Sequence, residues 1–187
     1  MKQTDLIADI MNGHDCRPRK AHNDWVGIII HHTGIGDQSS PTPEWMKKFY
    51  GSMKSWLTTK DANILSAHYL ISATGEISQL VDPKTHVSYH AGVSSYFHPI
   101  KRTPAEGWNE YAIGIELVGD GNKVPYPQEQ MEALIKLTRL LMKQFPTIDP
   151  RCITGHENIA PGRKSDPGKY FNWKQFFQGI YSIQGEG

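Results

Sequence analysis

The residues best suited to chemistry lie in one segment near the C-terminus, from Gly155 to Gly168. This segment holds one imidazole, two carboxylates, a lysine and an arginine, and its Pro and Gly content predicts a loop with no regular helix or strand. His156 opens the segment and Asp166 lies near its end. Histidine and carboxylate side chains are both zinc ligands, so the predicted loop carries two candidate ligands of a metal site.

A third candidate ligand follows an apolar run. Residues 25–32 are mostly β-branched and apolar, which predicts a buried strand that delivers His31 and His32 to the edge of a sheet. Hydrolytic zinc sites usually take three protein ligands, and His31, His156 and Asp166 make such a set. A lone histidine at a strand end is more often a hydrogen-bonded surface residue, and only the combination favours a metal. Adjacent strand residues point to opposite faces, so we expect His31 or His32 to bind, but not both.

Glu116 and Lys164 are candidates for proton transfer and for charge stabilisation. Residues 112–118 alternate in a strand pattern that turns Glu116 away from the Ile/Leu side. A strand glutamate is most often a solvated face residue, whereas a glutamate in a cleft suits a general base. Lys164 is ordinarily a solvated loop cation, but its position between His156 and Asp166 fits the stabilisation of a developing oxyanion.

The other histidines fall into two groups. Three of the nine remain possible ligands or site-lining groups: His68, His86 and His90. Three more are expected to be solvated loop residues: His14, His22 and His98.

The predicted elements alternate between strands and helices. Strands are expected at 65–73 and 76–81, joined by a turn at Thr74–Gly75, and at 112–118 and 151–154. Helices are expected to begin at Thr42 and at Pro127, the second ending at Pro146. The interleaving predicts an α/β fold with a central mixed sheet and helices on both faces. The 187 residues fit a single domain, 1–187, with a core of about 22–180.

Composition limits the partners and the compartment. Lys and Arg number 20 against 19 Asp and Glu, so the chain lacks the basic field that nucleic-acid binding usually needs. Cys16 and Cys152 are far apart and are read as reduced thiols of a cytosolic protein. No apolar run has the length of a signal peptide or of a membrane span, so we expect a cytoplasmic protein without a membrane segment. No obligate protein partner is evident.

Six short motifs occur in order along most of the chain. They are Ile30–Thr33, Ser66–Ile71, His90–Ser94, Ile113–Leu117, Gly155–His156 and Gly162–Gly168. Together they resemble the zinc-dependent N-acetylmuramoyl-L-alanine amidases, a superfamily that includes bacterial AmpD-type recycling amidases, phage lysozyme-type amidases and animal peptidoglycan recognition proteins. Residues 43–60 match none of these patterns.

The resemblance implies a role for each matching residue. It implies Zn²⁺ ligands at His31, His156 and Asp166, where an aspartate in the third position is the AmpD-type choice and a cysteine is the phage and animal one. It implies a general base at Glu116 and a catalytic lysine at Lys164. The tyrosine of the phage branch has no counterpart, because Ala67 stands at its position. His90 resembles a residue of the substrate cleft.

The activity implied by the resemblance is hydrolysis of the amide bond between N-acetylmuramic acid and L-alanine, in peptidoglycan or in soluble muropeptides. The enzyme would act as an endolysin that reaches the cell wall through holin-type release, or as a recycling amidase. The alternative is a non-catalytic module that binds peptidoglycan. Such binders typically lack a complete ligand set, and all three positions are filled here, which favours the enzyme.

Overall fold

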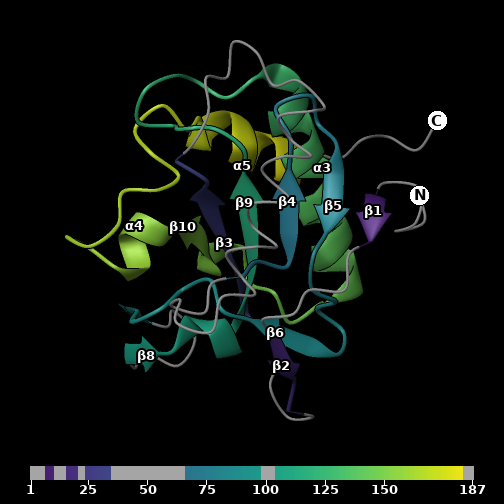
Figure 1. Ribbon diagram of the computed structural model, residues 1–187, viewed down its shortest axis with the longest axis vertical. Helices are drawn as coiled ribbons and strands as arrows, with labels where there is room; N and C mark the ends of the chain where they lie inside the picture. Colours follow the sequence, from purple (N-terminus) through teal and green to yellow (C-terminus); the bar gives the residue numbers. More distant parts are fainter. Residues whose placement is uncertain (1–6, 11–15, 21–23, 35–65, 98–103, 183–187) are drawn as a thin grey trace, which may run out of the picture.

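A six-stranded mixed sheet forms the centre of the molecule (Figure 1). The computed structural model describes residues 7–10, 16–20, 24–34, 66–97 and 104–182. Along the sheet the strands are β1 (Ile7–Ile10), β5 (Ile77–Gln79), β4 (Tyr69–Ile71), β9 (Ala112–Leu117), β3 (Gly27–His32) and β10 (Ile153–Gly155). The β4–β5 pair is antiparallel and every other neighbouring pair is parallel. The predicted mixed sheet is therefore confirmed.

Two small antiparallel sheets lie below the central one in Figure 1. One joins β2 (Cys16–Pro18) to β6 (His86–Ser88), and the other joins β7 (Ser95–Phe97) to β8 (Pro104–Glu106). A short 3₁₀-helix, Trp108–Glu110, follows β8 and leads into β9. These pieces bring the segment around His90 close to the central strands.

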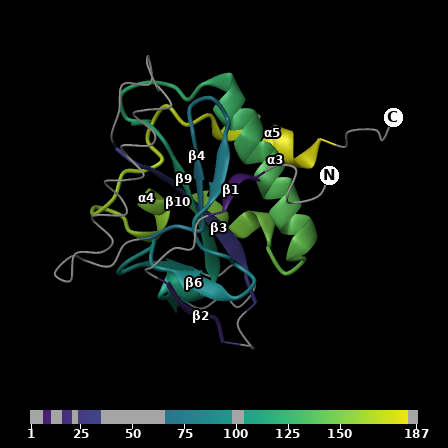
Figure 2. The ribbon, with the colours of Figure 1, turned by 45° about the vertical axis from the view of Figure 1, so that its right-hand side comes forward.

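Helices cover both faces of the central sheet, as predicted (Figure 2). On one face, α3 (Gln128–Gln144) and α5 (Trp173–Tyr181) pack over the isoleucines of β3 and β9. The opposite face carries Ile29, which packs against Ile159 of the short helix α4 (His156–Ile159). Because strand side chains alternate between faces, Ile28 and Ile30 belong to the first core, whereas Ile29 belongs to the second.

Most predicted elements are present with shorter ends. The strands expected at 65–73, 76–81 and 112–118 correspond to β4, β5 and β9, and the β4–β5 turn places Gly75 at a positive φ of 84°. The helix expected from Pro127 begins at Gln128, with Pro127 as its N-cap, and ends at Gln144. The helix expected at Thr42 lies outside the described residues. No helix in the described part of the chain is long and apolar enough to cross a membrane.

Near the C-terminus, one predicted strand has shifted ends and one predicted loop begins with a helix. The strand expected at 151–154 begins only at Ile153, because the Asp149 side chain accepts a hydrogen bond from the Arg151 backbone N–H and starts a 3₁₀ turn instead. The segment expected to be a loop from Gly155 onward opens with α4. After Gly155, the N-cap of α4, the next Pro or Gly is Pro161, so residues 156–159 are free to form one helical turn.

Candidate functional site

The candidate residues meet at the carboxyl edge of the three central parallel strands. His31 on β3 is the register partner of Glu116 on β9. On the other side of β3, Gly155 of β10 pairs with Ile30, so His156 follows at the same edge. Parallel strands that end together bring residues from distant parts of the chain into one row. The side chains of His31 and Glu116 both leave the sheet on the side away from α3, as the alternation predicted for Glu116.

Three of these side chains converge on one point. The Nδ1 atoms of His31 and His156 lie 3.0 Å apart, and each lies 3.0 Å from Oδ2 of Asp166. All three residues are buried. Within the described part of the chain, they form the group of His, Cys, Asp and Glu side chains arranged to hold a metal ion.

Hydrogen bonds alone do not satisfy this triangle. The carboxylate oxygen of Asp166 can only accept, and each Nδ1 either donates or accepts. If both nitrogens carry protons, the contact between them sets donor against donor; if only one does, the other nitrogen turns its lone pair towards the carboxylate. A divalent cation accepts electron pairs from all three atoms at once, and two imidazoles with one carboxylate are a common zinc donor set. The residues present therefore fit a metal such as zinc.

The electrostatics of the triangle keep His31 and Asp166 in their metal-binding forms. Burial would raise the pKa of Asp166, but its contacts with His156 and His31 outweigh burial and lower that pKa below the usual range. Burial lowers the pKa of His31 to about 4, although Asp166 acts in the opposite direction. At neutral pH His31 is therefore a neutral imidazole and Asp166 a carboxylate, as metal coordination requires.

Glu116 lies beside the triangle in an environment suited to proton transfer. Its Oε2 atom is buried and has no hydrogen-bond partner in the described residues. Burial, reinforced by the charge of Asp166, raises the pKa of Glu116 to about 8, and Lys164 opposes this rise. A carboxyl group with a pKa near neutrality can both take up and release a proton under physiological conditions.

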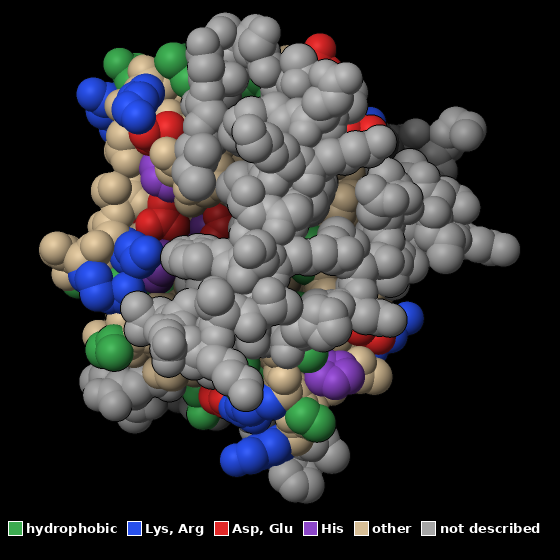
Figure 3. Space-filling model, in the orientation of Figure 1, with side chains coloured by type: hydrophobic (Ala, Val, Ile, Leu, Met, Phe, Trp, Pro, Cys, Tyr) green, Lys and Arg blue, Asp and Glu red, His purple; other side chains and the backbone are tan. Residues whose placement is uncertain are grey.

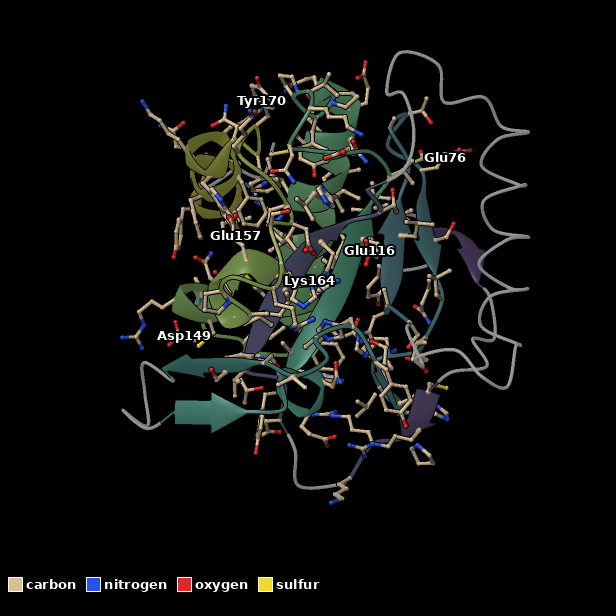
Figure 4. All side chains as sticks on the ribbon, turned by 60° about the vertical axis from the view of Figure 1, so that its left-hand side comes forward. Glu76, Glu116, Asp149, Glu157, Lys164 and Tyr170 are labelled. Carbon is tan, nitrogen blue, oxygen red and sulfur yellow. The ribbon has the colours of Figure 1, made fainter. Side chains whose placement is uncertain are left out.

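Lys164 supplies a positive charge at the exposed side of the same site. It lies in the turn after α4, and Figure 4 shows it near Glu116, whereas Glu76 lies well away from both. In the space-filling view, histidine and acidic side chains appear together at the left of the described surface, with Lys and Arg side chains beside them (Figure 3). The site thus combines buried ligands with an exposed cation.

The segment that carries Asp166 is tied to the rest of the fold by contacts that sequence patterns did not predict. The Tyr126 hydroxyl donates a buried 2.6 Å hydrogen bond to the carbonyl of Pro167. The Asp166 carbonyl accepts from the Glu157 backbone N–H at 2.9 Å. A Cβ atom on Gly155 would lie 2.5 Å from Cδ of Pro167, so a glycine is needed for this close approach. These contacts link residues distant in sequence, and no local sequence signal reports them.

Arg163 joins that segment to the loop after β6. Its guanidinium donates to the carbonyls of Ala91 and Val93, at 3.0 and 2.6 Å. The Ala91 carbonyl also lies 3.2 Å from Nε2 of His156. In the sequence, Arg163 is distinguished only by its position in the motif Gly162–Gly168.

The remaining histidines take other positions. His32 points to the face opposite His31, and its Nδ1 accepts from the Gly121 backbone N–H at 3.1 Å. His68 is buried and its Nδ1 contacts Ser88 and Gly114, while His86 contacts Thr85. His90 is only 1% exposed and lies behind His31, with its Nδ1 3.0 Å from Nε2 of that ligand. Histidines 14, 22 and 98 lie outside the described residues.

Comparison with known proteins identifies the family of the chain. Residues 21–169 match the protein family described as N-acetylmuramoyl-L-alanine amidase. The chain belongs to this amidase family. It is 35% identical over 167 residues to the 1,6-anhydro-N-acetylmuramyl-L-alanine amidase AmpD of Enterobacter cloacae, covering 87% of the chain and 83% of that relative. It is 40% identical over 116 residues to AmpD of Haemophilus influenzae, where the match spans 62% of the chain and 59% of the relative.

Solved amidase structures share the fold. A crystal structure of a selenomethionine AmpD derivative superposes with a TM-score of 0.69 and 29% identity, covering 92% of this chain and 94% of that one. The Escherichia coli amidase AmiD, solved with anhydro-N-acetylmuramic acid-L-Ala-D-γ-Glu-L-Lys, superposes with a TM-score of 0.64 and 28% identity, covering 86% of this chain and 60% of AmiD. The predicted fold class and amidase family are therefore confirmed.

Proposed function

We propose that this amidase hydrolyses the amide bond between N-acetylmuramic acid and L-alanine, with one zinc ion held by His31, His156 and Asp166. The observation that carries the proposal is the triangle of three ligand atoms, each 3.0 Å from the other two, which a cation satisfies and hydrogen bonds do not. Zinc, when bound, lowers the pKa of a water molecule and polarises the substrate carbonyl.

Glu116 is the proton carrier in this proposal. Its carboxylate takes a proton from the attacking water and delivers it to the leaving amine of L-alanine. Burial supports the second step, because a pKa of about 8 favours the protonated form of Glu116 at neutral pH. The positive charge of Lys164 favours the carboxylate form, which the first step needs.

Lys164 stabilises the negative charge that develops on the carbonyl oxygen during attack. An exposed ammonium group at the entrance to the buried ligands can approach that oxygen from the solvent side. The expected contribution is that of one charge-stabilising donor, about 10²–10³-fold in rate.

The relatives indicate which substrates to compare. The AmpD relatives are named for 1,6-anhydro-N-acetylmuramyl-L-alanine, and AmiD was solved with an anhydro-muropeptide. Soluble anhydro-muropeptides are therefore the preferred substrate in this proposal, which favours recycling over lysis of intact walls. The same amide bond occurs in polymeric peptidoglycan, so intact sacculi form the second arm of the test.

The experiment incubates the zinc-loaded protein separately with anhydro-muropeptides and with sacculi. New L-alanine amino termini without new reducing sugar ends are expected, and faster release from the soluble substrate. Faster release from sacculi would assign the protein to wall lysis. New reducing ends, or binding to sacculi without release of any product, would contradict the proposed amidase activity.

A further inference from the structure

His90 occupies a fixed position directly behind a proposed metal ligand. Its ring lies 3.0 Å from Nε2 of His31 on one side and 2.9 Å from the carbonyl of Ala112 on the other. The Nδ1 atom faces His31 and the Nε2 atom faces the carbonyl. The resemblance of its motif implied a substrate-cleft residue, but a side chain 1% exposed and enclosed by these two contacts faces the protein interior.

The carbonyl of Ala112 determines where the protons lie. A backbone carbonyl can only accept, so Nε2 of His90 carries a proton and donates it. A neutral imidazole has one ring proton, which leaves Nδ1 of His90 as an acceptor. The 3.0 Å contact to His31 is then a hydrogen bond donated by Nε2–H of His31. A neutral His31 with its proton on Nε2 presents a lone pair on Nδ1, the atom that faces His156 and Asp166.

His156, the second histidine of the triangle, has its proton on the same ring nitrogen as His31, but it contacts a backbone carbonyl directly. Nε2 of His156 lies 3.2 Å from the carbonyl of Ala91, to which it donates directly, so its Nδ1 also presents a lone pair. Among the residues that the structure describes, Nε2 of His31 contacts Nδ1 of His90 and no backbone carbonyl. The Ala91 carbonyl therefore orients His156 directly, whereas the Ala112 carbonyl orients His31 through His90.

Neighbouring residues fix the backbone and the ring of His90 in position. The Asn109 side chain accepts from the backbone N–H groups of His90 and Ala91, at 2.9 and 2.7 Å. The imidazole packs against Gly114 on β9, where a Cβ atom would lie 2.4 Å from Cγ of His90. A glycine in the middle of a buried strand loses side-chain packing, and here the space it leaves is filled by the ring.

We infer that His90 is a positioning residue. The Ala112 carbonyl fixes the proton of His90 on Nε2, so Nδ1 of His90 accepts a hydrogen bond from Nε2–H of His31. This contact sets the tautomer in which His31 binds the metal. This role rests on the proposed zinc site and extends it to a residue that contacts neither the metal nor the substrate. Partners of this kind typically change metal affinity by about 10–100-fold when they are removed.

Two substitutions of similar size separate this role from simple packing. In His90→Asn, the Oδ1 atom is two bonds from Cβ, like Nδ1 of histidine, and can still accept from His31. In His90→Gln, the side-chain amide is three bonds from Cβ, like Nε2, so it reaches the Ala112 carbonyl but leaves His31 without its acceptor. His68→Gln, at a buried histidine whose ring lies edge-on to His90 but does not contact the triangle, is the control for the loss of a buried ring beside His90.

The test measures the zinc dissociation constant of each variant by competition with a chelator, together with its melting temperature. His90→Gln is expected to bind zinc about 10–100-fold more weakly, whereas His90→Asn and His68→Gln stay close to the unchanged protein. Equal affinities for His90→Gln and His90→Asn, whether both high or both low, would overturn the inference. Weaker binding by His90→Asn than by His90→Gln would overturn it as well.

A spectroscopic measurement on the unchanged protein needs no variant to fold. Two-bond ¹H–¹⁵N correlations of the imidazole rings, recorded without and with zinc, are expected to show the proton of both His90 and His31 on Nε2. A proton on Nδ1 of His90 would contradict the relay. If the unchanged protein binds no zinc at all, the proposed function fails; if it binds zinc but His90→Gln binds equally well, only the role of His90 fails.

Discussion

His31 and Glu116 are paired in register on the neighbouring parallel strands β3 and β9. The pairing places a buried metal-ligand candidate and a carboxyl group of raised pKa side by side at the carboxyl edge of the sheet. Among the described residues, the His31 side chain bonds to His156, Asp166 and His90, and no hydrogen bond joins it to the Glu116 side chain. A substitution at Glu116 can therefore separate proton transfer from metal binding.

Glu116→Gln keeps the shape of the side chain and removes its basicity. Zinc content and melting temperature are expected to stay near those of the unchanged protein, while kcat falls about 10²–10⁴-fold. The matched control is Glu76→Gln, in the β4–β5 turn away from the site, which should leave kcat unchanged (Figure 4). Near-normal turnover of a zinc-loaded Glu116→Gln protein would remove Glu116 from the mechanism.

Lys164→Ala tests the exposed cation. Because the side chain is exposed, its loss should not affect folding or zinc content, and kcat should fall about 10²–10³-fold. Lys174→Ala, which removes an exposed lysine from α5, is the control for a change in net charge. Steady-state kinetics on an anhydro-muropeptide distinguish the two variants. An equal effect of both would show that Lys164 acts only through the overall charge.

The raised pKa of Glu116 predicts a pH dependence of stability in the metal-free protein. The folded pKa is about 8 against an ordinary value of 4.5, so the folded state binds a proton that the unfolded state releases between these values. The stability contributed by Glu116 is complete below pH 4.5 and is lost as the pH rises towards 8. Groups whose pKa is lowered in the folded state, such as Asp166, change the stability in the opposite sense. The stability of the unchanged protein is therefore compared with that of Glu116→Gln, in which only the Glu116 contribution is removed.

Denaturant unfolding of chelator-treated protein at several pH values measures this effect. The free energy of unfolding of the unchanged protein, relative to Glu116→Gln, is expected to fall from pH 5 to pH 8, which lies in the window set by the two pKa values. A relative stability that is constant or that rises over this range would show that Glu116 is an ordinary carboxylate.

Tyr126→Phe tests whether the Asp166 segment is held by the buried phenol. The substitution removes the 2.6 Å hydrogen bond and leaves the carbonyl of Pro167 without this donor, so a loss of about 1–3 kcal/mol in stability is expected. Zinc affinity should fall with it, because Asp166 directly precedes Pro167. Tyr170→Phe is the control, since Tyr170 is 43% exposed. Unchanged stability and affinity in Tyr126→Phe would show that other contacts suffice to hold the segment.

Sequence patterns were sufficient for the parts of the site that depend on strand periodicity. The apolar run before His31 and the alternation around Glu116 predicted both strands and the face of Glu116, because side-chain direction in a strand follows from position alone. The choice between His31 and His32 needed the structure, in which His32 bonds to Gly121 on the other face. The sequence did not predict α4, because the Pro and Gly residues that follow it from Pro161 onward indicate a loop for the whole segment.

The contacts that support the ligands could not be predicted in this way. His90 and Ala112 lie 22 residues apart, and His90 and His31 lie 59 apart. Gly114 is an ordinary strand glycine in the sequence, and its purpose appears only when the ring of His90 fills the space beside it. Tertiary packing, which no local pattern encodes, decides these pairings. The same holds for α5, whose aromatic residues pack on α3.

Zinc binding by single-residue variants tests the central claim most directly. Elemental analysis of gently purified protein is expected to give about one zinc per chain, as for a single site with three protein ligands. His31→Ala, His156→Ala and Asp166→Ala should each lose the metal, while His32→Ala keeps it. A zinc-free unchanged protein that also fails to bind added zinc, or loss of zinc in His32→Ala but not in His31→Ala, would contradict the site described here.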